Sequence, residues 1–82
     1  MTKTYICVHV YDDGDTELTK LNLTPEGNRA MLLSGDICFH VNDMETLRKE
    51  LQSYGCEDAD IEKALQYILA DKPGDSCIVG KV

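Results

Sequence analysis

The sequence predicts an α+β fold, with a mainly antiparallel sheet of four or five strands and two α-helices packed on one face. Three observations lead to this prediction. Apolar and β-branched residues alternate near both ends of the chain, which is typical of strands. An Asp-Gly pair after the first of these runs indicates a hairpin. Two amphipathic stretches with helical spacing follow one another in the second half of the chain.

The 82 residues are expected to form a single domain covering positions 1–82. A chain of this length buries roughly 60% of the surface of its unfolded form, so it can build one thin core. With one phenylalanine and no tryptophan, that core is expected to be aliphatic. The expected order is strand, strand, a third element that is strand or helix, then strand, helix, helix and strand.

The first expected strand, TYICVHVY, covers residues 4–11 and is rich in β-branched and aromatic types. Ile6, Val8 and Val10 share one of its faces. Because both faces are fairly apolar, we expect this strand to lie centrally in the sheet. The opposite face carries Tyr5, Cys7, His9 and Tyr11.

The stretch DDGD that follows predicts a tight turn, because Gly14 adopts a positive φ at no steric cost. The partner strand TELTKLNL covers residues 16–23. We expect Thr19, Leu21 and Leu23 on its inner face. The residues expected to face outward are Leu18, Lys20 and Asn22.

Residues 24–33 admit two interpretations. In the first, Pro25 is the second residue of a type I turn, and NRAMLL forms a third strand. In the second, Thr24 caps a helix whose first residue is Pro25. Because Gly27 weakens such a helix, we favour the strand.

DICFHV, residues 36–41, is expected to form the next strand. Asn42 and Glu45 match a capping box and predict a helix over residues 43–54. Gly55 is expected to end this helix in the left-handed conformation.

Asp58 is the expected N-cap of the second helix, which the sequence DKPGD ends. SCIVGKV, residues 76–82, is expected to form the last strand. The apolar positions of the second helix are Ile61, Ala64, Leu65, Ile68 and Leu69.

The chain is acidic, with 15 Asp and Glu against 8 Lys and Arg, giving a net charge of −7. Such a field repels phosphate groups, so direct binding to nucleic acid or to anionic membranes is not expected. It attracts a basic protein partner and speeds their encounter. Solubility is the alternative explanation, because small domains often carry a charge of this size.

Two short segments concentrate the acids. The first, DDGDTE, lacks the calcium-loop pattern: counting from Asp12, its glycine is third instead of sixth and its twelfth residue is Leu23 instead of glutamate. A turn explains this segment, and helix capping explains the second one, CEDAD. If the acids of the two segments have a function, we expect it to come from their combined negative potential. The candidate partner-binding residues are Asp12, Asp13, Asp15, Glu17, Glu57, Asp58 and Asp60.

Cys-x-His occurs twice and includes both histidines of the chain. Residues two apart on a strand share a face, so neighbouring strands could bring two thiolates and two imidazoles together. That is the ligand set of a zinc site, although the usual C-x₂₋₄-C and H-x₃₋₅-H spacings are absent. The candidate zinc ligands are Cys7, His9, Cys38 and His40. No other cofactor is expected.

The first residues, MTKTYICVHV, contain no apolar run long enough for a signal peptide, and no segment of the sequence could span a bilayer. A cytoplasmic location is therefore expected. There the four cysteines are expected to be free, buried thiols, while their even number also permits two disulfides in an exported protein.

No motif indicates catalysis: nothing orients a base beside a cysteine, and no glycine-rich loop offers an oxyanion hole or a phosphate site. Three hypotheses follow. The first is a non-enzymatic protein-binding module, in its sharper form an inhibitor or adaptor of basic, nucleic-acid-handling machinery such as phages and mobile elements encode. The second is a zinc-binding domain. The third is an oligomerising subunit in which Tyr5 and Tyr11 face another copy.

Overall fold

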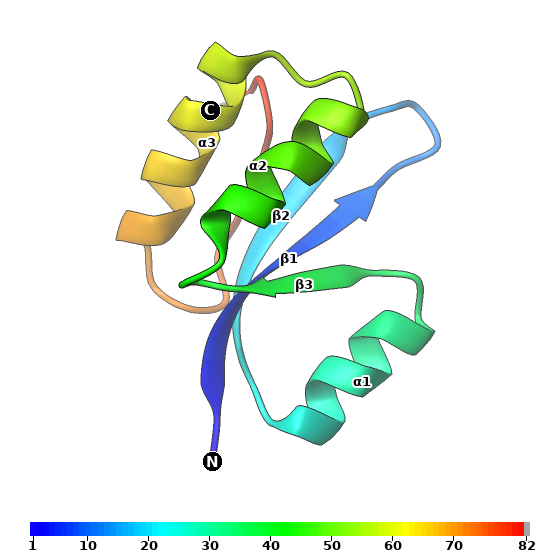
Figure 1. Cartoon of the computed structure of the whole chain (residues 1–82), viewed down its shortest axis with the longest axis vertical. Coiled ribbons are helices and arrows are strands. Elements are labelled where there is room, and N and C mark those ends of the chain that lie inside the picture. The colour runs from blue at the N-terminus through cyan, green and yellow to red at the C-terminus, as the bar shows by residue number, and fades with distance from the viewer. Residues whose placement is uncertain (82) are drawn as a thin grey trace.

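The structure, a computed structural model, describes residues 1–81 of the chain. Within them, a four-stranded antiparallel sheet and three helices confirm the α+β prediction (Figure 1). No helix among the described residues is long and apolar enough to cross a membrane. In chain order the elements are β1 (Lys3–Val10), β2 (Thr16–Leu23), α1 (Pro25–Leu33), β3 (Ile37–His40), α2 (Met44–Ser53), α3 (Asp58–Ala70) and β4 (Ser76–Ile78).

The strands lie in the order β3-β1-β2-β4, and each neighbouring pair is antiparallel. β1 and β2 form the predicted hairpin. In its turn, the Gly14 N–H donates to the Tyr11 carbonyl at 2.9 Å, and the Tyr11 N–H donates to the Asp15 carbonyl at 2.8 Å. Gly14 has a φ of +91°, as a three-residue turn of this kind requires, so the Asp-Gly prediction is confirmed.

The favoured prediction of a strand at residues 28–33 is wrong, because Pro25–Leu33 forms helix α1. β2 and β3 both run antiparallel to β1, so they are parallel to each other. The chain must therefore travel back along the sheet between them, which a helix does well. As the alternative interpretation expected, Thr24 begins the helix, and its Oγ1 accepts a hydrogen bond from the Gly27 N–H at 3.1 Å.

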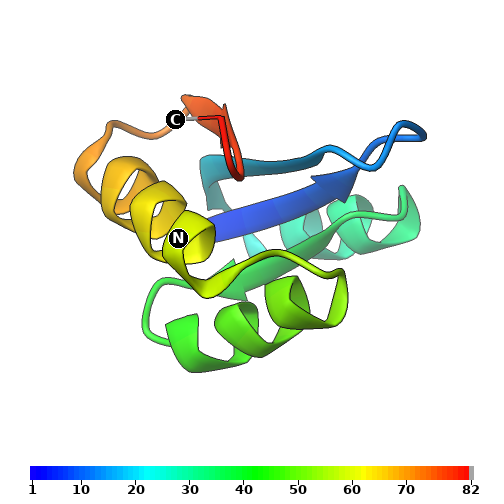
Figure 2. The ribbon, with the colours of Figure 1, turned by 90° about the horizontal axis from the view of Figure 1, so that it is seen from above.

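The hydrophobic core joins α2 and α3 to the inward-facing residues of the sheet, and α1 contributes none of its members. Figures 1 and 2 show α1 lying apart from α2 and α3, across the sheet. The expected faces of β2 are wrong: Leu18 is fully buried in this core, while Leu21 is only half-buried. The buried residues of the core are Ile6, Val8, Leu18, Phe39, Leu47, Leu51, Ile61, Ala64, Leu65, Ile68 and Cys77.

The expected N-caps of α2 and α3 are each displaced by one residue. Asn42 does not cap α2; Asp43 holds the N-cap position and makes no side-chain bond to the helix backbone. At α3 the N-cap residue is Glu57 in place of Asp58, again without such a bond. The first turn of α3 still carries Asp58 and Asp60, where the positive end of the helix dipole favours them. Capping therefore does not account for these acids.

Helix α1 has no fully buried residue, and its Gly27, Asn28 and Met31 face is half-buried. Leu32 and Leu33 are 63% and 89% exposed. At its beginning, Gly27 lies against the side chain of Leu23. At its far end, the Asp36 N–H donates to the carbonyl of Met31 at 3.0 Å, just before β3 starts. The position of α1 therefore depends on that of β3.

Candidate functional site

The two predicted acidic segments meet at one end of the molecule through the last described residues. The Lys81 Nζ lies 2.8 Å from the Asp15 Oδ2, next to the β1–β2 turn. Gly80 lies beside the carboxylate of Asp60 in the first turn of α3, so that a Cβ at this glycine would be 3.5 Å from the Oδ2. Gly80 and Lys81 thus bridge the hairpin and α3, which are far apart in sequence.

Within the turn, the carboxylates have local partners. Asp13 Oδ1 accepts a hydrogen bond from the Asp15 N–H at 2.9 Å, which fixes the turn. The Tyr11 hydroxyl donates to Glu17 at 3.0 Å, and this bond raises the pKa of Tyr11. The hydrogen bond to Asp15 likewise raises the pKa of Lys81. Local bonds therefore hold the turn acids in place, while Lys81 offsets one of their charges.

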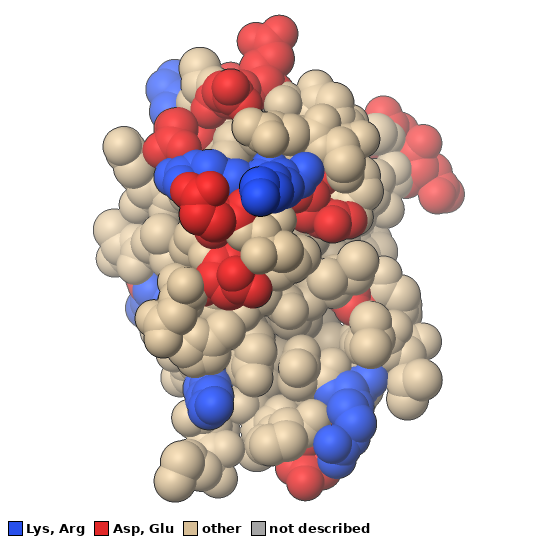
Figure 3. Space-filling model, in the orientation of Figure 1, with Lys and Arg blue, Asp and Glu red and all other residues tan. Residues whose placement is uncertain are grey.

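At α3, Asp58 Oδ1 accepts a hydrogen bond from Gln52 Nε2 at 2.9 Å, which ties the end of α2 to the start of α3. Glu57 is exposed beside it. Figure 3 shows acidic side chains concentrated in the upper half of the view, over the start of α3 and at the projecting turn. We call this region the acidic end. It comprises Asp12, Asp13, Asp15, Glu17, Glu57, Asp58 and Asp60.

The predicted zinc ligands are brought together only in part. β1 and β3 are neighbours, as the zinc hypothesis required, and Cys7 lies directly opposite Cys38. The two residues form a disulfide, so the expectation of four free thiols is wrong for this pair. The Val41 N–H donates to the Thr4 carbonyl at 3.2 Å, and such bonded pairs alternate along the ladder. Cys7 and Cys38 therefore occupy a non-hydrogen-bonded pair, where side chains are closest.

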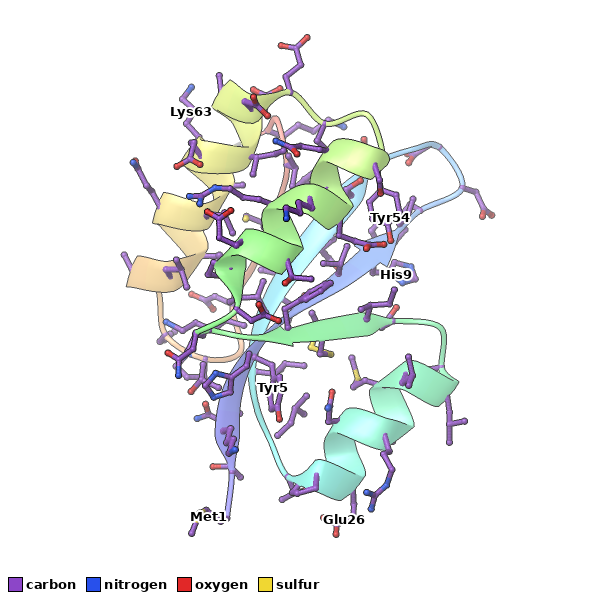
Figure 4. The ribbon with its side chains drawn as sticks, in the orientation of Figure 1. Met1, Tyr5, His9, Glu26, Tyr54 and Lys63 are labelled. Carbon is purple, nitrogen blue, oxygen red and sulfur yellow. A yellow bond between two sulfur atoms is a disulfide. The ribbon has the colours of Figure 1, made fainter. Side chains whose placement is uncertain are left out.

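The two histidines lie on opposite sides of the disulfide. Because β1 and β3 are antiparallel, moving two residues on from each cysteine leads in opposite directions, and the histidines end about 13 Å apart along the strands. His40 packs edge-on against Tyr5, with ring centroids 5.6 Å apart. His9 lies toward the β1–β2 turn (Figure 4). Among residues 1–81 there is no group of three or more His, Cys, Asp and Glu residues that could hold a metal.

Asp36 is a polar partner that the sequence analysis missed. His9 Nδ1 lies 2.7 Å from the Asp36 Oδ1, and the His9 ring packs edge-on against Tyr11 with a centroid distance of 4.6 Å. Asp36 immediately precedes β3, so it faces His9 just as Cys38 faces Cys7. One step beyond the Val8–Ile37 pair, the β1–β3 register places Asp36 opposite His9. The sequence alone does not show that β1 and β3 are neighbours.

The other two cysteines are free thiols. Cys77 is buried in the core beside α3, and its burial raises the pKa of its thiol. Cys56 follows α2 and packs partly against the same core. The paired and the free cysteines thus belong to different sides of the sheet.

The surface formed by residues 1–81 contains no detectable pocket. No protein-family model, no curated protein and no solved structure matches the chain. The described geometry therefore offers two places of chemical interest: the acidic end and the Cys7–Cys38 pair with its flanking side chains.

Proposed function

We propose that this protein is a small, non-enzymatic binding module that uses its acidic end to engage a basic protein partner. The observation that carries the proposal is the meeting of the two acidic segments through Lys81 and Gly80. Seven carboxylates of one end can then act on one partner surface at once. Lys81 pairs with Asp15, and Lys63 extends from the start of α3 in the same region (Figure 4). The carboxylates of this end outnumber these two cations and would attract a basic partner.

The same end offers side chains suited to a protein interface. Tyr11 is 42% exposed and lies beside Glu17, so an aromatic ring accompanies the carboxylates. Tyrosine is enriched in interfaces because it combines apolar area with a polar group. A partner with a basic, nucleic-acid-binding groove fits this combination, and occupation of that groove would inhibit the partner. The inhibitor role is the sharper form of the proposal.

Two variants with equal net charge test the role of the acidic end. The first carries Asp12→Asn, Asp13→Asn, Glu57→Gln and Asp58→Asn. The matched control carries Glu26→Gln, Asp43→Asn, Asp71→Asn and Asp75→Asn, which lie at the starts of α1 and α2 and after α3. Each variant changes the net charge from −7 by four units, to −3.

Heparin-binding proteins of the native host are incubated with the immobilised wild type and with both variants, and the retained proteins are quantified by mass spectrometry. We expect a partner that the wild type and the control retain and the acidic-end variant loses. Its affinity should fall as salt rises from 50 to about 300 mM, because ions screen exposed charges. Equal retention by both variants, or binding insensitive to salt, would contradict the proposal.

Self-association is a second candidate, favoured by the exposed Leu32 and Leu33 of α1. Exposed apolar side chains that form a contiguous patch can mark a contact surface. Light scattering at protein concentrations up to about 1 mM, compared between wild type and Leu33→Asp, tests it. A dimer lost in the variant would support this candidate, and a monomeric wild type would contradict it.

A further inference from the structure

We propose that Cys7 and Cys38 form a redox-active pair, in which Cys38 Sγ exchanges with low-molecular-weight thiols and Cys7 is the resolving cysteine. This proposal is independent of the function proposed for the acidic end. It assigns a covalent exchange site to the α1 side of the sheet.

The two sulfurs differ in access. Cys7 lies on the central strand β1 and is 3% exposed. Cys38 lies on β3, which is an edge strand of the sheet, and is half-buried. A thiolate attacks a disulfide along the sulfur–sulfur axis, so access decides which sulfur is attacked. The edge of the sheet is therefore the side from which an external thiol reaches the pair, and Cys38 is the sulfur it meets.

The ladder makes the reaction reversible without refolding. Cys7 and Cys38 face each other because β1 and β3 are paired on both sides of them, at Ile6 with Phe39 and at Val8 with Ile37. Phe39 is anchored in the core, which holds β3 beside β1 after the sulfurs separate. The two thiols of the reduced protein then remain neighbours. Such proximity raises the effective concentration of one thiol toward the other and favours closure of the bond.

A small thiolate RS⁻ attacks the Cys38 sulfur, an RS–S bond forms, and the Cys7–Cys38 bond breaks to leave a Cys7 thiolate, which takes a proton from water. A second RS⁻ attacks the R sulfur of this mixed disulfide and releases RSSR and a Cys38 thiolate, which is also protonated. The protein gains two electrons and two protons, and two thiols RSH are oxidised to RSSR. Closure by RSSR is the reverse sequence.

The reaction has a structural consequence at α1. The disulfide is a covalent link between β1 and β3, and α1 has no fully buried side chain and is followed directly by β3. Figure 4 shows this disulfide on the side of β3 that faces α1. Reduction should therefore loosen β3 and α1, while α2 and α3 keep their buried contacts.

Thiol reactivity tests the assignment directly. Cys7→Ser and Cys38→Ser are compared in a background that carries Cys56→Ser and Cys77→Ala, so that each protein has one thiol. We expect the remaining Cys38 to react with glutathione disulfide at least about tenfold faster than the remaining Cys7, in line with the dependence of thiol reactivity on access. Equal rates, or a faster Cys7, would overturn the assignment.

A measurement on the wild-type chain avoids reliance on variants that fold poorly. The protein is reduced with a monothiol, alkylated for short times under native conditions, and mapped by mass spectrometry. Cys38 should be alkylated first. After transfer to glutathione disulfide, the Cys7–Cys38 bond should re-form, with a mixed disulfide on Cys38 trapped at early times. Failure of this bond to re-form, or trapping on Cys7 instead, would overturn the proposal.

Hydrogen exchange on the same wild-type samples tests the consequence. Amides of β3 and α1 should exchange at least about tenfold faster in the reduced protein, whereas those of α2 and α3 should change little, because local opening follows local contacts. Uniform acceleration across the chain, or no change at α1, would contradict the link between the sulfur pair and the helix.

Discussion

The two sides of the sheet are built by different means. On one side, α2 and α3 bury Leu47, Leu51, Ile61 and Ile68 completely against the strands. On the other side, α1 has no fully buried residue and only a half-buried face at Gly27, Asn28 and Met31. The first side gains its stability from apolar area removed from water, and the second from a cap, a short strand and a disulfide. One face of the sheet therefore carries the hydrophobic core, and the other carries a helix without fully buried residues.

The difference shows that a helix can form with or without a buried apolar stripe. Helix α1 exists because the chain must pass from β2 to a strand parallel to it, so topology determines it more than its side chains do. Helices α2 and α3 exist because their apolar stripes complete the core.

The largest expected effect comes from paired truncations of leucine. Leu51→Ala on the core side removes a fully buried side chain and should lower the free energy of unfolding by about 3–4 kcal/mol. Leu33→Ala on the α1 side should change it by less than about 0.5 kcal/mol, because this leucine is almost fully exposed. Urea denaturation measures both. A large loss for Leu33→Ala would mean that the α1 side is covered in solution.

Reduction of the Cys7–Cys38 bond should have the next largest effect. The bond joins residues 31 positions apart, so its loss gives the unfolded chain more freedom and should lower the free energy of unfolding by about 2–3 kcal/mol. Urea denaturation with and without a reductant measures the difference. The Cys7→Ser/Cys38→Ser variant is the control, since reductant should leave its stability unchanged. An unchanged midpoint in the reduced wild type would contradict the prediction.

The helix N-termini should differ by a smaller amount. Thr24→Ala removes the Oγ1 that accepts from the Gly27 N–H and should cost about 1 kcal/mol. Glu57→Ala at the N-cap of α3 removes no bond to the helix backbone, so its cost should be smaller. Thermal unfolding followed by circular dichroism compares the two variants. A larger loss for Glu57→Ala would show that the dipole interaction of this acid outweighs the cap of α1.

The smallest expected effect is a loss of stability at alkaline pH. Burial raises the pKa of Cys77 above its ordinary value of 9.0, so the folded state retains a proton that the unfolded state releases. Stability from this thiol is thus fully present below pH 9 and is lost as pH rises through the folded pKa. Cys7 and Cys38 do not titrate while paired. Denaturation between pH 8 and 10 should show a shallower decline in Cys77→Ala than in the wild type, and equal slopes would contradict it.

Several elements were predictable because their signals are local. Gly55 ends α2 with a φ of +88°, and the N–H of the following Cys56 donates to the Leu51 carbonyl at 3.1 Å, as a left-handed helix end requires. The hairpin turn at Gly14 and the apolar positions Ile61 and Ile68 of α3 also follow from short-range patterns. In each case the residues that determine the structure lie within a few positions of one another.

The failures concern long-range pairing. The helix at Pro25–Leu33 depends on where β3 joins the sheet, and a strand order of β3-β1-β2-β4 is not visible in local spacing. The same holds for the burial of Leu18, because which face of β2 is inward depends on the positions of α2 and α3. The meeting of the two acidic segments depends on residues 80–81, which lie beside Asp60 and Asp15.

The four residues of the zinc hypothesis do not come together, because β1 and β3 are antiparallel. The hypothesis correctly required β1 and β3 to be neighbours, and Cys7 does face Cys38. In an antiparallel pair, however, identical Cys-x-His motifs point their histidines in opposite directions. A parallel pair would have aligned them, so the direction of β3 decided the outcome.

The position of β1 between β2 and β3 also determines the order in which the chain can assemble. β1 meets β2 across a turn of three residues, whereas it meets β3 only after some thirty residues have been placed, and β4 reaches β2 later still. Closing a short loop costs less entropy, so the hairpin is expected to form within microseconds and to serve as the template for both edges. The sheet would then grow outward from its centre, with β3 and β4 added at its two edges.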